Sequence, residues 1–464
     1  LMTKKNKGNA VMINQYYDTL KTYINKYGDK TILFWQCGDF YEVYGRESEP
    51  ENLLNFTRIC DFTYSSENGN LKAGMPKRAV QKWSNRIIEN GYTLVIFDQF
   101  KDPTVKSHYR RKESYILSPS TTIETCSNII SNNYCSVIWI EKYNPDFQNK
   151  LPYFYCGTSV IDSFTGKSIF YEYKYENNDI HNTTAFDKLD KFVSIYNPTE
   201  CVIIHNYDEI SYINDIIQFA SINSKKNHII SLKDNSNELT IQAKNSEKQT
   251  YQKEILNHFF DIKDYNVFLE TTKFNYYPYA TSSYCFLLDF MYQHNPNLIN
   301  KISYPIFENN KNNIDLATHC LKQLNIIDTN DSNKEYSSVL KLINKCKTVM
   351  GKRRFNHIIL HPSCDVNYLK AEYNIVEYVI KEYTNLEFIR KELSYIKDIE
   401  KLYRKINLGV VKPHELANLS LDLERILTIK KTIDKKNKYK KYLNSKINED
   451  IEDNLNNLND NLKH

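Results

Sequence analysis

TILFWQCGDFYE, at residues 31–42, is an apolar and aromatic run that ends in a turn. β-Branched and aromatic side chains favour strands, and glycine followed by aspartate is typical of a turn. The run therefore predicts a strand over residues 31–35 and a turn at its end. On an extended backbone, side chains two residues apart point to the same side, so Phe40 and Glu42 are predicted to share one face.

An aromatic ring and a carboxyl group on one face can act on a damaged base pair. The ring can wedge into a weakened base stack, and the carboxyl group can hydrogen-bond an exposed base edge. The same pair also occurs by chance in many proteins, with the phenylalanine in a core and the glutamate exposed. The residues around the pair decide between these two interpretations.

The neighbouring sequence predicts an α+β domain over residues 10–126. Apolar residues recur with helical spacing over 11–27, and Gly28 supplies a stop. A second helix is predicted over 78–89, and a strand follows at 92–97.

Two further domains are predicted, so the fold class is multidomain α/β followed by α. Residues 130–260 open with strands at 136–140, 153–161 and 168–173, and a short buried strand follows at 201–204, which favours a mixed-sheet α/β domain. From 270 to 464 the pattern is helical. Pro413 opens one predicted helix, and leucines and isoleucines three or four residues apart predict a long amphipathic helix over 443–462.

Composition limits the function classes. The 464 residues carry 61 Lys and Arg against 56 Asp and Glu, so any basic patch must be local. The ten cysteines form no Cys-x-x-Cys pair and predict reduced thiols in an intracellular compartment: cytoplasm, nucleus or viral factory. We expect no membrane association, because no apolar run is long enough to span a bilayer. Abundant Asn, Lys, Ile and Tyr suggest an AT-rich genome, as in giant viruses and some protists.

Residues 40–42 resemble the Phe-x-Glu mismatch-recognition motif of the MutS family of DNA mismatch-repair proteins. The resemblance extends in order to residues 12–17, 73–80, 98–103 and 111–121. It implies that Phe40 stacks on a mispaired base and that Glu42 hydrogen-bonds that base. A carboxylate near phosphates is disfavoured, so Glu42 is expected to bond best when it is protonated or faces a base donor or N7. By charge and placement, the candidate contacts to the DNA backbone are Lys77, Arg78, Arg111 and Lys112, each of which could equally be a solvated surface residue.

The rest of the chain resembles two further MutS domains. Residues 157–167 and 197–200 are similar to the connector domain, which implies an RNase-H-like fold, and residues 314–326 and 348–362 are similar to the helical lever or core domain. The resemblance does not extend to the family's clamp or carboxy-terminal ATPase, which we expect to be missing from these 464 residues. We therefore expect neither an enzyme nor a bound cofactor here, since ATP and Mg belong to the missing domain, as does the dimer interface.

Three other patterns are weaker. Residues 166–168 imitate the end of a phosphate-binding loop, but Ile161 stands where its first glycine belongs, so a hairpin turn is predicted. Asp162 occupies a nuclease-like strand position without a second or third acid, and one carboxylate does not hold two metals. His357, His361 and Cys364 have metal-ligand types, but Pro362 ends the helix and predicts structural histidines. No metal site is expected.

Two functions remain open at this point. The first is binding of mismatched or looped-out bases in double-stranded DNA, with Phe40 at least partly exposed at the tip of the first domain. The second is a protein-interaction scaffold that has lost DNA sensing, because the resemblance implies that the connector contacts downstream repair proteins.

Overall fold

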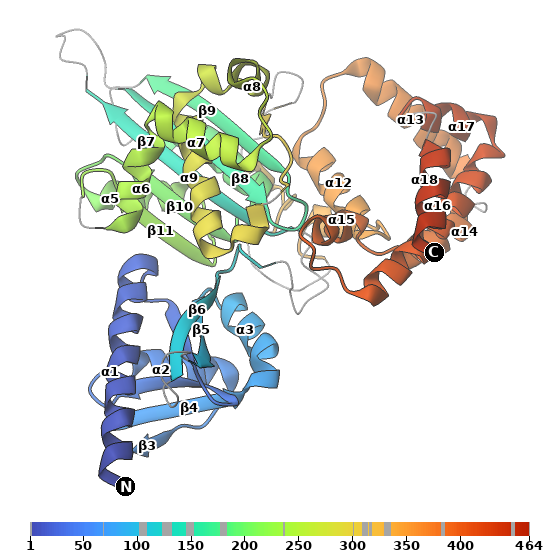
Figure 1. Cartoon of the computed structure of the whole chain (residues 1–464). Helices are drawn as coiled ribbons and strands as arrows, with labels where there is room; N and C mark the ends of the chain where they lie inside the picture. Colours follow the sequence, from blue (N-terminus) through green and yellow to red (C-terminus); the bar gives the residue numbers. More distant parts are fainter. Residues whose placement is uncertain are drawn as a thin grey trace. The chain divides into compact units, whose positions relative to one another are not determined.

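The computed structural model of the chain contains two compact units, residues 1–307 and 308–464, which are described separately (Figure 1). The structure describes residues 2–67, 69–101, 109–122, 132–144, 153–176, 183–234, 237–299, 301–308, 314, 318–328, 336–381, 386–446 and 451–463. Parts of two motifs quoted above, Asp102-Pro103 and residues 315–317, lie outside these ranges, as does Cys126.

The first unit begins with a six-stranded sheet in the order β3-β4-β2-β1-β5-β6. The central strand β1 is parallel to β5 and antiparallel to β2. The carboxyl ends of β1 and β5, the start of β2 and the end of β4 therefore meet at one end of the sheet, called here the Phe40 end. The strands are β1 Thr31–Cys37, β2 Phe40–Arg46, β3 Ser65–Glu67, β4 Asn70–Pro76, β5 Thr93–Lys101 and β6 Tyr109–Leu117.

Helices cover both faces of this sheet (Figure 1). Helix α1 (Met2–Tyr27) packs Tyr16 and Leu20 against Leu33 and Trp35 of β1. Helix α2 (Glu51–Cys60) and helix α3 (Val80–Glu89) pack on the other face. β1 is buried on both faces, which explains its unbroken apolar sequence. Helix α1 starts nine residues earlier than the apolar pattern over 11–27 predicts, since its first turns are polar.

A second sheet follows in the order β11-β10-β7-β8-β9-β12. β7, β8 and β9 are antiparallel neighbours, whereas β10 is parallel to β7 and to β11. The strands are β7 Tyr134–Tyr143, β8 Tyr153–Asp162, β9 Ser168–Glu176, β10 Glu200–His205, β11 Lys226–Ser231 and β12 Ile306–Phe307.

Helices also cover both faces of the second sheet. One face packs on α4 (Asp187–Tyr196) and α5 (Ile210–Phe219). The other packs on α6 (Glu238–Ser246), α7 (Gln249–Phe259), α8 (Tyr265–Thr272) and the buried α9 (Pro278–His294). Helix α9 lies so close to β8 that a Cβ at Gly157 would come within 2.4 Å of the backbone at Tyr279 and Ala280.

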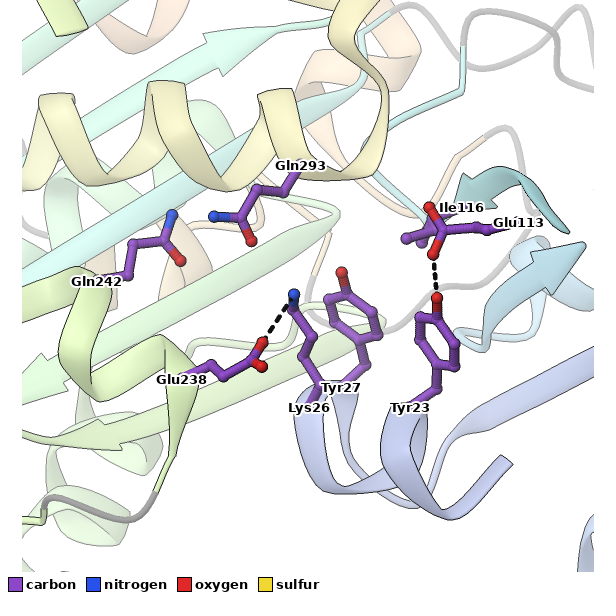
Figure 2. Close-up of a pocket in the computed structure, with 8 residues that line it drawn as sticks. All are labelled: Tyr23, Lys26, Tyr27, Glu113, Ile116, Glu238, Gln242 and Gln293. Atoms are coloured by element: carbon purple, nitrogen blue, oxygen red, sulfur yellow. Dashed lines mark hydrogen bonds and ion pairs between the residues drawn. The ribbon is translucent and has the colours of Figure 1, made fainter. Parts of the chain in front are cut away.

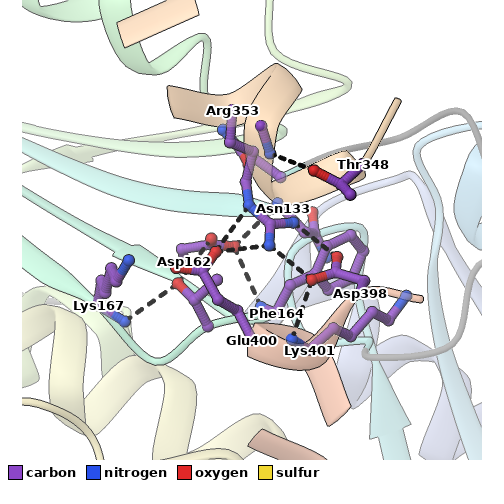
Figure 3. Close-up of polar contacts among 12 residues, drawn as sticks. Asn133, Asp162, Phe164, Lys167, Thr348, Arg353, Asp398, Glu400 and Lys401 are labelled. Atoms are coloured by element: carbon purple, nitrogen blue, oxygen red, sulfur yellow. Dashed lines mark hydrogen bonds and ion pairs between the residues drawn. The ribbon is translucent and has the colours of Figure 1, made fainter. Parts of the chain in front are cut away.

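The second unit is helical, as the sequence predicts. Arg353 of α12 donates to both carboxylate oxygens of Asp398, at 2.6 and 2.7 Å, and to Glu400 of α15 (Figure 3). Leu402 packs against Leu419 and Leu423. The helices are α10 Thr318–Gln323, α11 Val339–Ile343, α12 Val349–Leu360, α13 Val366–Lys381, α14 Leu386–Tyr395, α15 Ile399–Asn407, α16 Pro413–Asp434, α17 Asn437–Asn444 and α18 Ile451–Lys463.

The predicted sequence of a mixed α/β part and a helical part is confirmed. The finer division into domains at 10–126, 130–260 and 270–464 stays a prediction, as does the RNase-H-like fold of the middle domain. In the structure, α9 packs on β7 and β8, so residues up to 307 belong with the first unit.

Candidate nucleic-acid interface

Phe40 is the first residue of β2 and lies opposite Cys37 and Pro76 in the sheet. Tyr41 and Val43 point into the core formed with α2 and α3, so the strand alternation turns Phe40 and Glu42 to the other face. Phe40 has an exposed fraction of 49%. The expectation that its ring is at least partly exposed is therefore confirmed.

Hydrogen bonds brace the turn before Phe40. Gly38 has a φ of 62°, which favours glycine, and its N–H donates to Oε1 of Gln99 at 2.7 Å. The Gln36 amide donates to the Gly38 carbonyl at 2.9 Å and accepts from the Gln99 N–H at 2.8 Å. β1 and β5 therefore fix the position from which Phe40 projects.

The carboxylate of Glu42 is held by two partners. Lys72 of β4 places Nζ 2.9 Å from its Oε1, and the Tyr44 hydroxyl donates to its Oε2. Burial, together with this hydrogen bond, raises the pKa of Tyr44 far above its usual range, so Tyr44 remains a donor. The sequence pattern did not reveal Lys72, because the register of β2 and β4 creates the pair.

Lys77 and Arg78 follow β4 directly, in the short 3₁₀ helix Lys77–Ala79, and both are exposed. The Lys77 N–H donates to the Asp39 carbonyl at 2.8 Å, which joins this segment to the turn before Phe40. Two of the predicted backbone contacts thus lie at the Phe40 end.

Arg111 and Lys112 differ in their surroundings. The Arg111 side chain is half-buried: Nε donates to the Gln36 carbonyl at 2.6 Å, and the guanidinium lies 5.3 Å from the Trp35 ring centroid. Arg111 therefore braces β1 from inside, and its contact with phosphate stays a prediction. Lys112 is exposed on β6.

The Phe40 end also carries exposed side chains that the sequence analysis did not single out. β5 runs past the end of β1, and its last residues pair with the first residues of β6, Phe100 with Arg110 and Lys101 with Tyr109. Phe100, Lys101 and Tyr109 are exposed. Aromatic rings interleaved with cations are typical of surfaces that contact nucleic acid.

A separate cavity of about 280 Å³ lies near the carboxyl end of α1, between α1, β6, α6 and α9 (Figure 2). Lys26 and Glu238 form an ion pair across it at 2.9 Å, and Tyr23 donates to Glu113. The hydroxyl of Tyr27 is buried in its lining without a hydrogen-bond partner. The cavity includes none of the residues at the Phe40 end.

Two of the sequence matches quoted above meet where the two sheets join. The buried Glu200 accepts hydrogen bonds from the hydroxyls of Ser118 and Ser120, at 2.5 and 2.6 Å, and lies 2.9 Å from Nε2 of His228. Nearby, Nζ of Lys226 lies 2.5 Å from the Thr93 hydroxyl. Residues 118–121 and 197–200, quoted above as separate matches, therefore form one polar joint.

The weaker patterns have structural roles. Gly166 and Lys167 lie in the hairpin turn between β8 and β9, as predicted. Asp162 accepts hydrogen bonds from the N–H groups of Asn133 and Phe164, both at 3.1 Å (Figure 3). His361 lies 3.3 Å from Oε1 of Glu308.

Several absences apply to the described part of the chain. Within it, no three His, Cys, Asp or Glu side chains gather as a metal site would require. The cysteines described are all free thiols. Among the same residues, no helix combines the length and apolar character needed to cross a membrane.

Comparison with known proteins gives matches at both ends of the chain. The family model of MutS domain I matches residues 11–125, and that of MutS domain III matches residues 319–464. Together they cover more than half of the chain.

Similar proteins come from a virus and from bacteria. A DNA mismatch repair protein mutS homolog of Acanthamoeba polyphaga mimivirus is 28% identical over 87% of this chain and 38% of its own length. The DNA mismatch repair proteins MutS of Clostridioides difficile and Petrotoga mobilis are each 24% identical, over 92% and 89% of this chain and 40% and 44% of their own lengths. The chain thus spans about two fifths of these relatives.

Proposed function

The chain belongs to the MutS family, and on that premise we propose that it recognises and binds mismatched or looped-out bases in duplex DNA. The observation that carries the proposal is the exposed ring of Phe40 at the start of β2, with Glu42 on the same face. The braced turn supports it, because a ring that enters a base stack must project from a fixed position.

The physical basis is the weakness of a mismatch. A mispaired base has lost stacking and pairing energy, so kinking or opening the duplex there costs less than at a Watson–Crick pair. Phe40 would enter that step and stack on the mispaired base, as apolar wedges do in other proteins that bend DNA. Matched duplex resists the same insertion, which gives discrimination.

The cations at the Phe40 end supply affinity without base preference. Lys77, Arg78 and Lys112 are exposed and would contact phosphates, which fixes the position of the protein on the duplex. Arg111 would contribute mainly by holding β1 in place. Glu42 would hydrogen-bond the mispaired base.

We further propose that residues 1–464 bind rather than catalyse, with no cofactor of their own. The helix-covered second sheet would serve as a connector that contacts other repair proteins in a reducing compartment. The alternative is a scaffold that contacts repair proteins but no longer senses DNA. Binding to matched and mismatched duplexes separates the two proposals.

The test is Phe40→Ala, measured by titration with one mismatched and one matched duplex of otherwise identical sequence. Stacking of an aromatic side chain on a base is worth roughly 1–3 kcal/mol. We therefore expect Phe40→Ala to lose about one to two decades of affinity for mismatched DNA and little for matched DNA.

Tyr276→Ala is the matched control, because Tyr276 is an exposed aromatic residue beside the second sheet. This variant should keep the preference for mismatched DNA. If Phe40→Ala binds mismatched DNA as tightly as the parent does, Phe40 is not the sensor and the scaffold proposal replaces this one.

A further inference from the structure

β5 and β6 extend beyond β1 at the Phe40 end. The parallel register of β1 and β5 places Cys37, the last residue of β1, level with Gln99. Lys101 therefore lies two residues farther out, where it pairs with Tyr109 of β6. Both side chains are exposed, and Tyr109 has an exposed fraction of 54%.

Tyr109 and Phe40 point to the same face of the sheet. On β5, Phe97 packs with α1, and strand alternation turns Lys101, four residues later, to the same face. Residues directly opposite one another in an antiparallel pair share a face, so Tyr109 points the same way as Lys101. On β2, Tyr44 also packs with α1, which puts Phe40 on this face.

The outer end of this face is basic on β5 and β6. Arg111 is the next residue of β6 on the α1 side, and its guanidinium lies 3.4 Å from Cys37 Sγ. Glu113 comes after it, and its carboxylate accepts the Tyr23 hydroxyl of α1. The ring of Tyr109 therefore lies beside cations, and the first carboxylate on this side of β6 is turned toward a helix. This charge favours an anionic partner.

The sheet sets the distance between Tyr109 and Phe40. β1 and β5 lie between β2 and β6, which gives three strand spacings, or about 14 Å. Phe40 lies opposite Cys37 and Tyr109 lies opposite Lys101, so Tyr109 is also about 7 Å farther out along the strands. The two residues are thus about 16 Å apart, which equals the rise of about four to five base pairs. Tyr109 cannot enter the base step that Phe40 enters.

Phe40 lies between two basic groups in strand order. Lys77 and Arg78 follow β4 on one side of β2, whereas Lys101 lies on β5 on the other side. A duplex that runs across the strand ends would meet both groups while Phe40 reaches a base between them. Cationic and polar side chains at such positions contact phosphate and sugar, and they fix the register of a protein on the duplex.

We propose that Tyr109 and Lys101 form a second DNA contact, on the sugar–phosphate backbone about four to five base pairs from the base that Phe40 meets. This proposal rests on the proposed function and adds the segment of flanking duplex that the protein holds. Lys101 bonds a phosphate, and the Tyr109 ring packs on the adjoining sugar with its hydroxyl toward the phosphate. The contact adds affinity without base preference, because the backbone is the same at every step.

The first measurement locates the contact on the duplex. The unmodified protein is titrated with a mismatched duplex in which neutral methylphosphonate linkages replace the phosphates from the third to the sixth step on both sides of the mispaired base. A second duplex carries the same number of neutral linkages from the ninth to the twelfth step. We expect the first duplex to bind about threefold or more weakly, and the second to lose less than about twofold.

The second measurement uses Lys101→Gln and Tyr109→Ala. Tyr115→Ala is the matched control for the tyrosine, because Tyr115 is exposed on the same strand but pairs with Ile96, which packs on the other face. Lys30→Gln is the control for the lysine, because Lys30 is exposed just before β1, at the other end of the sheet.

We expect Lys101→Gln and Tyr109→Ala each to bind the unmodified mismatched duplex about threefold or more weakly, and to lose less than about twofold further when the near linkages are neutral. Both variants should keep the parent's ratio of affinities for mismatched and matched DNA. Lys101→Gln should also reduce the salt dependence of binding by about one phosphate contact. The two controls should bind as the parent does and remain sensitive to the near linkages.

Several results would overturn the inference. One is a Lys101→Gln or Tyr109→Ala protein that binds as tightly as its control. Another is a variant that stays as sensitive to the near linkages as the parent, because another residue then holds those phosphates. Loss of mismatch preference in Tyr109→Ala would mean that Tyr109 senses the mispaired base itself. A parent that binds matched and mismatched DNA equally refutes the proposed function, whereas a parent that discriminates but ignores the near linkages refutes the inference alone.

Discussion

Phe40 and Glu42 share a face because strand geometry demands it, and this feature is predictable from the sequence alone. The partners of Glu42 are not predictable in this way. Lys72 lies thirty residues away in the chain and reaches Glu42 only through the register of β2 and β4. Arg111 shows the same limit, since its charge suggests a surface contact but the fold turns its guanidinium toward Trp35.

At the residue scale, Arg111 and Lys112 are predicted to differ although they are adjacent cations. Arg111→Ala removes a charged hydrogen bond to Gln36 and a cation–π contact, so it should destabilise the fold by about 1–3 kcal/mol. Lys112→Ala should change stability by less than about 0.5 kcal/mol. It should weaken both duplexes alike and reduce the salt dependence of binding by about one phosphate contact.

Thermal unfolding and titrations at two salt concentrations check both variants. An Arg111→Ala protein with the parent's melting temperature would contradict its role as a brace. A Lys112→Ala protein that loses only mismatched DNA would contradict its role as a phosphate contact.

At the element scale, the joint between the two sheets shows what local patterns miss. The strands β1, β7 and β8 are predictable because their apolar runs match buried strands. The contact of residues 118–121 with Glu200 is not, because it links segments 80 residues apart. The packing of α9 on the second sheet also joins segments that are far apart in the chain. From its helical pattern alone, the sequence assigned α9 to the helical domain that begins at residue 270.

The joint should make stability pH-dependent. Burial lowers the pKa of His294 to about 4 and also lowers that of His228, so both are neutral in the folded protein at pH 7. Burial alone would raise the pKa of Glu200, but the hydrogen bond from His228 and the charge of Lys226 lower it below its usual range. For all three groups the unfolded chain binds protons at higher pH than the folded chain. Their stabilisation is therefore present at pH 7 and is lost as the pH falls.

The free energy of unfolding should drop by up to about 3 kcal/mol between pH 6.5 and 4 on account of His294 alone, since each pKa unit corresponds to about 1.4 kcal/mol. Denaturant unfolding at pH 7.5, 6.5, 5.5 and 4.5 measures this slope. His294→Phe, which cannot protonate, should flatten it, whereas His258→Gln, at an exposed position of α7, should leave it unchanged. Equal slopes in the parent and His294→Phe would exclude His294 as the titrating group.

At the scale of the whole molecule, the candidate interface lies in only one of the two units. The candidate interface, with its braced turn and its cations, lies within residues 1–307, as do both sheets and the joint between them. The helical unit at 308–464 has its own core around Leu402, Leu419 and Leu423. The spacing of its leucines predicts that this unit is helical. The same periodicity does not predict what its exposed apolar side chains contact.

This division predicts that residues 1–307, produced alone, keep the discrimination of the full chain. Phe40, Glu42 and Lys72 make the contacts described above within this unit, so the ratio of affinities for mismatched and matched duplex should stay within about twofold, or 0.4 kcal/mol, of the full-chain value. Absolute affinity can fall, because cations of the second unit that touch phosphate would be lost equally from both duplexes.

Residues 308–464 alone should show no mismatch preference. Parallel titrations of the three proteins, after circular dichroism has established that each is folded, test this. A folded 1–307 protein that binds both duplexes equally would mean that discrimination needs the helical unit to hold the duplex against Phe40, so a ring in a fixed position is not sufficient.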